Sequence, residues 1–91
     1  MSIYPNNYRW IGNTLSYDLA PEATGLWIEF KKPGTTEWLT VFKDINTAPQ
    51  QCPMDTGTYG TVGEIRASGS VGDEFPPFPP PQAIQNERPP E

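Results

Sequence analysis

The chain has 91 residues, which is enough for one domain and too few for a second core. Eleven acidic residues outweigh six basic ones, and the resulting net charge of -5 argues against binding to nucleic acid. Histidine is absent and Cys52 is the only cysteine, which excludes Ser-His and Cys-His catalysis, intramolecular disulfides and the usual zinc sites.

The elements expected along the chain are short strands, because apolar residues alternate with polar ones and no helical stripe is present. The first strand is expected to be formed by Tyr4, Tyr8, Trp10 and Ile11, with Pro5-Asn6-Asn7 as its irregular entry. The second is expected at Thr14–Leu19 and ends before Pro21. The third and fourth, Leu26–Lys31 and Trp38–Phe42, are joined by Pro33-Gly34, which suits a type II turn, and are predicted to form a hairpin.

Beyond Lys43 the prolines at 49 and 53 allow only a short strand at a sheet edge, with Cys52 as a packed hydrophobe. Alternation returns in TYGTVGEIRAS, where Gly60 and Gly63 suggest a bulge or a close backbone approach. A turn at Ser68-Gly69-Ser70 is expected to open the last strand. Six or seven short antiparallel strands with regular turn signals predict an all-β fold, a small β-sandwich.

The runs TLSYDLAPEATG, LWIEFKKPGTTEWLTV and TGTYGTVGEIRASGSVGDEFPP together resemble a fibronectin type III domain, which belongs to the Ig-like sandwiches. The resemblance covers roughly residues 13–77 and is best at Ile65–Glu74, where it matches the closing segment of such domains. It implies that Leu26, Ile28 and Phe30 are alternating core residues of the third strand. In a sandwich of this kind, the Tyr59 hydroxyl is expected to donate a hydrogen bond to backbone at a sheet corner.

A change of composition at Glu74 divides the chain into an expected sandwich, residues 1–74, and a proline-rich extended tail, residues 75–91. Seven of the seventeen tail residues are proline, which favours polyproline II and excludes a helix or a central strand. Residues 1–74 are therefore expected to fold without the tail. Phe75 and Phe78 are expected to fold back on the sandwich or to dock on another chain, because a solvated tail gains nothing from exposing them.

No catalytic, cofactor-binding or metal-binding residues are predicted. Asp73 and Glu74 are adjacent and point to opposite faces if extended, while Asp18 and Glu22 flank Pro21 in a turn. These carboxylates fit solvated surface charge better than an acid/base pair. The glycines form no phosphate-binding loop, and no cofactor is expected. An enzyme is therefore not expected.

The candidate residues are instead those of a protein interface. Alternation places Trp27 and Glu29 on the outer face of their strand and Ile28 on the inner face. Substitution of Glu29 is therefore expected to have little effect on stability. Alternation also places Trp38 and Phe42 on one face of the next strand, so that both faces of that strand are apolar. The extra apolar face is expected to be covered by the chain's own termini or to contact a neighbouring subunit. The predicted interaction residues are Trp27, Trp38, Phe42, Phe75, Pro76, Pro77, Phe78 and Pro79.

Two functions remain open from sequence. One is a structural module that docks on protein subunits of a larger assembly; its size, acidity and lack of cysteine pairs look like those of phage virion accessory proteins of the capsid or tail. A homo-oligomer is also allowed. The other is a soluble cytoplasmic adaptor whose FPPFP segment, which looks like an EVH1 ligand, or whose PxxP at Pro76–Pro79 binds a proline-recognition domain. The first ten residues lack a secretory signal pattern, and no apolar run predicts a membrane span, so a reducing cell interior is expected.

Overall fold

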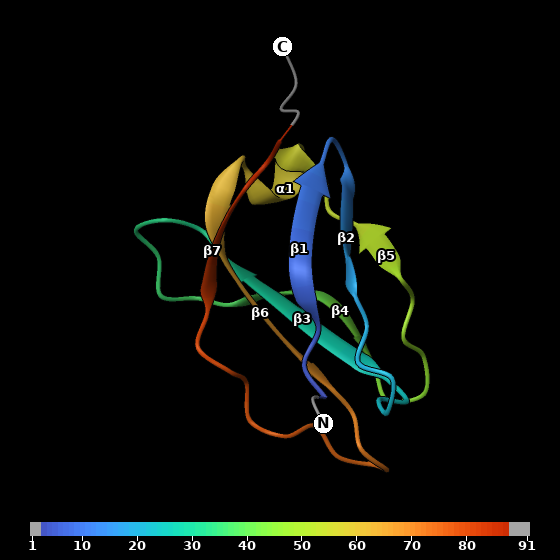
Figure 1. Cartoon of the computed structure of the whole chain (residues 1–91). Helices are drawn as coiled ribbons and strands as arrows, with labels where there is room; N and C mark the ends of the chain where they lie inside the picture. Colours follow the sequence, from blue (N-terminus) through green and yellow to red (C-terminus); the bar gives the residue numbers. More distant parts are fainter. Residues whose placement is uncertain (1–2, 88–91) are drawn as a thin grey trace.

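A computed structural model of the chain describes residues 3–87. Seven strands and one single-turn helix make up the fold (Figure 1). In chain order they are β1 (Asn6–Ile11), β2 (Thr14–Asp18), β3 (Leu26–Lys31), β4 (Leu39–Asp44), β5 (Gln51–Pro53), α1 (Thr56–Tyr59), β6 (Val62–Gly69) and β7 (Gln82–Gln85).

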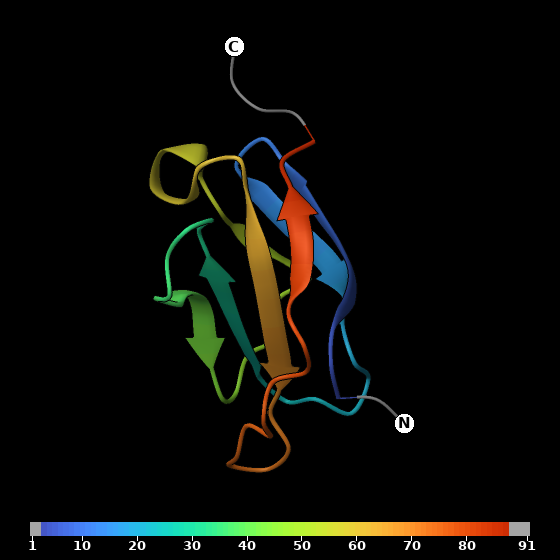
Figure 2. The same cartoon turned by 90° about the vertical axis from the view of Figure 1, so that its left-hand side faces the viewer.

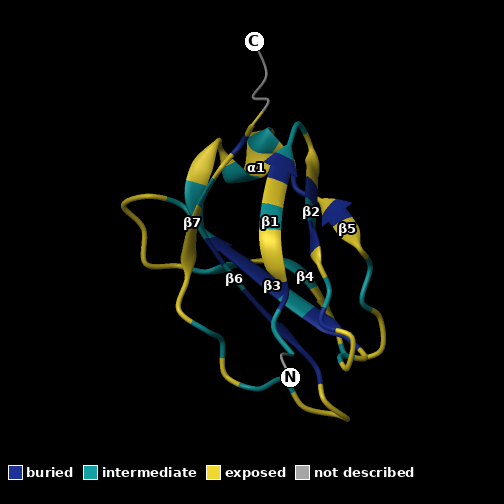
Figure 3. Ribbon diagram, in the orientation of Figure 1, coloured by how far each residue is buried: buried dark blue, intermediate teal, exposed yellow. Residues whose placement is uncertain are grey.

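The strands form two antiparallel sheets that pack face to face, an arrangement compatible with a β-sandwich. One sheet has the order β1-β2-β5 and the other β4-β3-β6-β7, with β5 short and at an edge as expected (Figures 1 and 2). The residues coloured dark blue in Figure 3 are buried, and they occur on strands of both sheets. The largest members of the core come from both layers: Trp10, Leu15, Leu26, Ile28, Phe30, Met54 and Ile65. The predicted all-β class and strand number are confirmed.

The hairpin of β3 and β4 forms as its turn residues predict. The Thr35 N–H donates to the Lys32 carbonyl oxygen at 3.3 Å, and Gly34 has φ of +76°. Proline at the second turn position and a positive φ at the third are the features of a type II turn. The expected register holds in β3, where Leu26, Ile28 and Phe30 are buried between the sheets.

A β-bulge in β4 overturns one predicted face. Ile28 pairs with Phe42, but Glu29 pairs with Thr40, so Val41 is the extra residue of the bulge. Phe42 therefore lies opposite Ile28 and packs against the core, whereas Trp38 lies over the Arg66 guanidinium on the outside of the sheet. The prediction that Trp38 and Phe42 share a face is wrong, because one extra residue reverses every later side chain.

Buried polar groups and close packing fix the interior. The Trp10 indole N–H donates to the Met54 carbonyl oxygen at 2.7 Å, and its ring meets Phe30 edge-on with centroids 5.7 Å apart. Cys52 is 3% exposed and is a packed hydrophobe, as expected. At Gly63 a side-chain carbon would overlap the Phe30 ring, which confirms a close approach there.

The single-turn helix α1 was not expected from the apolar pattern. A local cap makes it instead: an Asp55 carboxylate oxygen accepts from the Thr58 N–H at 2.8 Å, and Gly60 closes the turn with φ of +76°. Tyr59 at its end donates its hydroxyl to the Thr40 carbonyl oxygen at 3.4 Å. The bond to backbone is present as expected, although it is long and its acceptor belongs to β4.

The C-terminal segment forms part of the larger sheet. Ser68 and Gly69 continue β6, so the turn predicted there is wrong; the chain reverses instead at Val71–Glu74. Within residues 75–91, Gln82–Gln85 is β7 and pairs with β6. Asn86 then donates to the Gly12 carbonyl oxygen at 2.8 Å and bridges to β1. The sheet thus extends past the boundary predicted at Glu74, and residues 88–91 lie outside the described residues.

Candidate protein-interaction face

Aromatic rings and cations gather on the outer side of the four-stranded sheet. Strand β3 contributes Trp27, whose neighbours across the sheet are Lys43 of β4 and Ser68 of β6. Arg66 of β6 lies beside Glu29, two pairs further along the strands and on the same face. We call this surface the aromatic–cation face and define it by Trp27, Trp38, Lys43, Arg66, Phe75 and Phe78.

The indole of Trp27 is packed on several sides. Its ring meets Phe75 and Phe78 edge-on, with centroids 5.5 and 4.7 Å away, and the Lys43 ammonium lies 3.9 Å from its centre. These contacts leave the side chain half-buried. They also bury its Nε1, which has no hydrogen-bond acceptor among the described residues. Buried donors without acceptors are rare in folded proteins and are unfavourable by about 1–3 kcal/mol.

Arg66 connects two of the rings through its guanidinium. The guanidinium carbon lies 4.0 Å from the centre of the Trp38 ring and 4.4 Å from that of Phe78, so the cation is held between two aromatic groups. Its Nε and Nη2 both donate to Oε1 of Glu29, at 3.0 and 2.6 Å. Glu29 is only 7% exposed as a result. The guanidinium is therefore fixed in position by charge, hydrogen bonds and stacking together.

The Phe75–Pro81 segment crosses this face mainly through side-chain packing. The Tyr4 hydroxyl donates to the Pro77 carbonyl oxygen at 2.9 Å. No backbone–backbone hydrogen bond of residues 75–81 is found within the described part of the chain, and five of these seven residues are prolines, which carry no backbone N–H. The segment is therefore anchored at its ends, by the Val71–Glu74 turn and by β7, and in its middle by Phe75 and Phe78.

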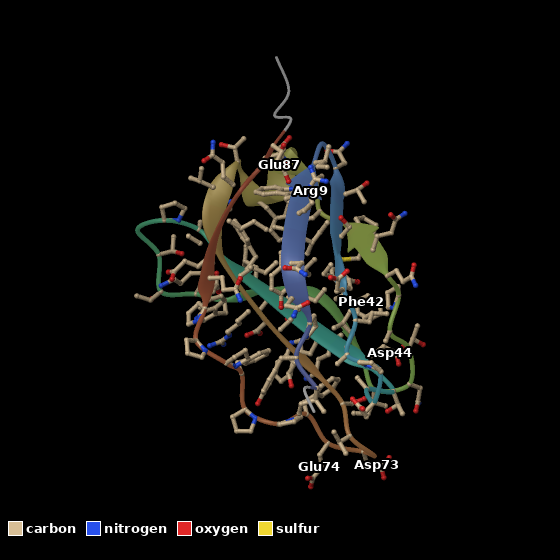
Figure 4. The ribbon with its side chains drawn as sticks, in the orientation of Figure 1. Arg9, Phe42, Asp44, Asp73, Glu74 and Glu87 are labelled. Carbon is tan, nitrogen blue, oxygen red and sulfur yellow. The ribbon has the colours of Figure 1, made fainter. Side chains whose placement is uncertain are left out.

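Seven of the eight predicted interaction residues belong to this region. Trp27, Trp38, Phe75 and Phe78 are on the aromatic–cation face, Pro76 and Pro79 are half-buried in the covering segment, and Pro77 accepts the bond from Tyr4. Phe42 is separate, on the core side of β4 (Figure 4). Lys43 and Arg66 were not among the predicted residues. The sequence carried no signal for either cation, since only the pairing of β3 with β4 and β6 places them beside the rings.

The carboxylates considered from the sequence are exposed, and Asp18 is hydrogen-bonded locally, within the described residues. Asp73 and Glu74 project from the tip of a loop, far from Arg9 and Glu87, which pair at 2.8 Å (Figure 4). Asp18 accepts from the Asn7 amide at 2.7 Å. Among residues 3–87 no three histidine, cysteine or acidic side chains are grouped as metal ligands. Nor does any helix in that range have the length and apolar character needed to span a membrane.

The strongest pKa shifts lie in the core, away from the aromatic–cation face. Burial raises the pKa of the Cys52 thiol to about 11 and that of the Tyr8 hydroxyl to about 12. Burial also raises the pKa of Tyr17, whose hydroxyl donates to the Pro49 carbonyl oxygen at 2.7 Å. All three groups stay protonated and neutral at neutral pH, which suits a packing role.

Comparisons with protein-family models, curated proteins and solved structures gave no significant match.

Proposed function

We propose that this chain is a non-enzymatic structural and binding module, a fibronectin III/Ig-like sandwich that docks on protein subunits of a larger assembly. The assembly we propose is a bacteriophage virion, formed in the cytoplasm, in which the chain is an accessory protein of the capsid or the tail. The observation that carries the docking function is the aromatic–cation face, where Arg66 lies between the Trp38 and Phe78 rings. The virion assignment rests on the size, acidity and lack of cysteine pairs that the sequence shares with phage virion accessory proteins.

The arrangement of the strands supports the sandwich part of the proposal. Seven strands divided three and four between two antiparallel sheets, with a core contributed by both, are compatible with an Ig-like module of about this length. The Pro33-Gly34 hairpin and the inward Leu26, Ile28 and Phe30 are compatible with what the fibronectin III resemblance implies.

The composition and order of the face support docking. Tryptophan and arginine are enriched among the residues that contribute most to binding energy in protein interfaces. Here stacking and the bond to Glu29 already hold Arg66 in place, so little side-chain entropy remains to be lost on binding. The exposed Lys43 adds a second cation. A partner with an acidic or aromatic surface would match this face.

The alternative, an adaptor that offers its proline-rich segment to a recognition domain, has less support. Such domains bind a free extended ligand. In this chain Phe75 and Phe78 are packed on Trp27, and β7 holds the end of the segment in the sheet. Binding in that mode would require the segment to leave the aromatic–cation face.

Sedimentation of particles from the natural source tests the docking function. The tagged chain is expected to migrate with large particles in a density gradient, and Lys43→Glu is expected to lower the bound fraction at least tenfold without unfolding the domain, since Lys43 is exposed. Gln50→Glu, which adds a negative charge at an exposed site outside the face, is the control. A wild-type chain that stays at the top of the gradient, or a Lys43→Glu chain that binds normally, overturns the proposal.

A further inference from the structure

The loop at one end of the molecule carries an exposed apolar residue on a well-anchored turn. We call Val71–Glu74 the tip. The Val71 N–H donates to the Glu74 carbonyl oxygen at 2.9 Å, and the Glu74 N–H donates back at 3.2 Å, with Gly72 supplying φ of +63°. Just before the tip, the Ser70 hydroxyl donates to the Ile45 carbonyl oxygen at 2.9 Å. Val71 is nevertheless 53% exposed, and Asp73 and Glu74 flank it in solvent (Figure 4).

The opposite end of the four-stranded sheet carries an apolar groove of about 450 Å³. It lies where β3 leads into its turn and β6 and β7 run side by side (Figure 2). Its lining residues are Lys31, Pro33, Val62, Gly63, Glu64, Ala83, Ile84 and Gln85. Val62 is 43% exposed, and Val62 and Val71 are the two large hydrophobic side chains that are exposed among residues 3–87. One lies in the groove and the other on the tip.

We propose that the tip of one copy docks in the groove of the next, so that the chain associates head to tail. This deepens the proposed function, on which it rests, by naming a second copy of the chain as one partner in the assembly. Within one copy the tip and groove cannot meet, because they lie at opposite ends of the sheet (Figure 2). Between copies, Val71 enters the apolar groove and covers Val62.

Charge favours this orientation. The tip carries Asp73 and Glu74 and no cation. The groove has Lys31 at its rim, and Lys32 follows it and makes no ion pair among the described residues. Glu64 is the opposing charge, and Lys31 already neutralises it at 3.1 Å. With Lys31 paired to Glu64, this end of the sheet keeps one net positive charge at Lys32, and docking brings the two tip carboxylates toward it, an attraction that salt screens.

The geometry also sets the form and strength of the assembly. Two different patches make a heterologous contact, which adds copies in one direction until a ring closes or the chain ends. A contact made by four tip residues falls below the roughly 1,200 Å² of stable interfaces, so the association is weak and depends on concentration. The anchored turn keeps the entropic cost of docking small.

A pair of complementary variants tests the contact by sedimentation equilibrium. Val71→Asp spoils the tip and keeps the groove, whereas Val62→Asp spoils the groove and keeps the tip. Wild type is expected to self-associate with rising concentration, and each variant alone to do so at least tenfold more weakly. Their equimolar mixture is expected to form complexes of two chains and nothing larger, since only one intact tip and groove then meet. Gln50→Asp is the charge control and is expected to behave as wild type.

Several outcomes would overturn this inference. They are a wild type that is monomeric at every concentration up to about 1 mM, a variant that still self-associates like wild type, and a mixture that stays monomeric or grows beyond two chains. Circular dichroism of each variant shows whether it is folded, and both substitutions are at exposed sites. Failure here with normal particle sedimentation would leave the proposed function intact, because docking on other subunits does not need the tip.

Discussion

The ring of Phe78 packs against the indole of Trp27, with centroids 4.7 Å apart and planes at 61°. The proline-rich segment thereby covers a tryptophan on the outer side of the sheet that carries it. Covering by the chain's own segment and contact with a partner were alternatives at the level of the sequence. The structure shows the first alternative: the chain's own segment covers Trp27. Lys43 of this face stays exposed, and Trp38 and Phe78 stay partly exposed.

Replacement of Phe78 by alanine should uncover Trp27. We expect a loss of roughly 1–2 kcal/mol in the free energy of unfolding, because a half-buried aromatic pair and a contact with Arg66 are removed. The tryptophan emission should shift to longer wavelength as the indole becomes hydrated. Urea denaturation and the emission spectrum measure both effects. Pro80→Ala, at an exposed position in the same segment, is the control. An unchanged spectrum in Phe78→Ala would contradict the packing.

Trp27→Phe should reduce the free energy of unfolding far less than Trp27→Ala. Phenylalanine keeps a ring between Phe75, Phe78 and Lys43 and removes the Nε1 donor that has no acceptor. Relief of that unpaired donor offsets the lost ring area, so the stability of Trp27→Phe should stay within about 1 kcal/mol of wild type. Trp27→Ala should lose roughly 2–4 kcal/mol. Equal losses in the two variants would show that the indole N–H has an acceptor in solution.

Glu29→Ala tests whether a side chain that points outward from the sheet, but is buried there, contributes to stability. Alternation places Glu29 outward, and it does face outward, but Arg66 holds it at 7% exposure. Removing it leaves the guanidinium without its carboxylate, and we expect a loss of about 1–3 kcal/mol by urea denaturation. Ile28→Asp should unfold a domain whose free energy of unfolding is about 5 kcal/mol, since the substitution buries an unpaired carboxylate. The exposed Glu22→Ala is the control. A Glu29→Ala domain as stable as this control would mean that the ion pair contributes nothing.

Local alternation and turn chemistry account for what could be predicted of the fold. The inward face of β3, the Pro33-Gly34 turn and the edge position of β5 all follow from residue order. The bulge at Val41 could not be predicted, because apolar residues occupy both odd and even positions of β4 and alternation therefore does not show which face is buried. Strand β7 is only four residues long and follows three prolines, so its pairing depends on β6 rather than on its own pattern.

The candidate site was predictable only in part, for a related reason. Aromatic residues on the outer face can be found by parity, which identified Trp27. The cations that complete the face cannot, because Lys43 and Arg66 become neighbours of the rings only through strand pairing. Alternation shows which way a side chain points but not what covers it, which is why the burial of Glu29 was not predicted.

Alkaline pH should destabilise the fold through groups that are buried in their neutral form. The pKa of Cys52 is raised from 9.0 to about 11 and that of Tyr8 from 10.0 to about 12, in both cases by burial. The unfolded chain therefore releases protons first, and stability, which is full below pH 9, falls as the pH rises from 9 toward 12. Urea denaturation at pH 7, 9, 10 and 11 should show the decline. In Cys52→Ala, the free energy of unfolding, taken relative to that variant's value at pH 7, should fall less between pH 9 and 11, by on the order of 1–2 kcal/mol. Stability that rises above pH 9 would contradict the sign.

Truncation after Glu74 tests whether the C-terminal segment is part of the domain. The composition change predicts that residues 1–74 fold without the tail. Three sets of contacts now lead us to expect the opposite. Truncation removes β7 from the edge of β6, the Glu87 N–H bond to the Trp10 carbonyl oxygen at 2.7 Å, and the cover over Trp27. Each is worth on the order of 1 kcal/mol or more, and a small domain has only about 5 kcal/mol in total.

The truncated chain should therefore lose its cooperative thermal transition by circular dichroism. Addition of a synthetic peptide of residues 75–87 should restore that transition, since the peptide carries both the aromatic cover and β7. A peptide in which Phe75 and Phe78 are replaced by alanine is the matched control and should restore less. A truncated chain that melts within a few degrees of the full chain would make residues 1–74 an independent domain. The contacts of the segment would then be a docking arrangement rather than part of the fold.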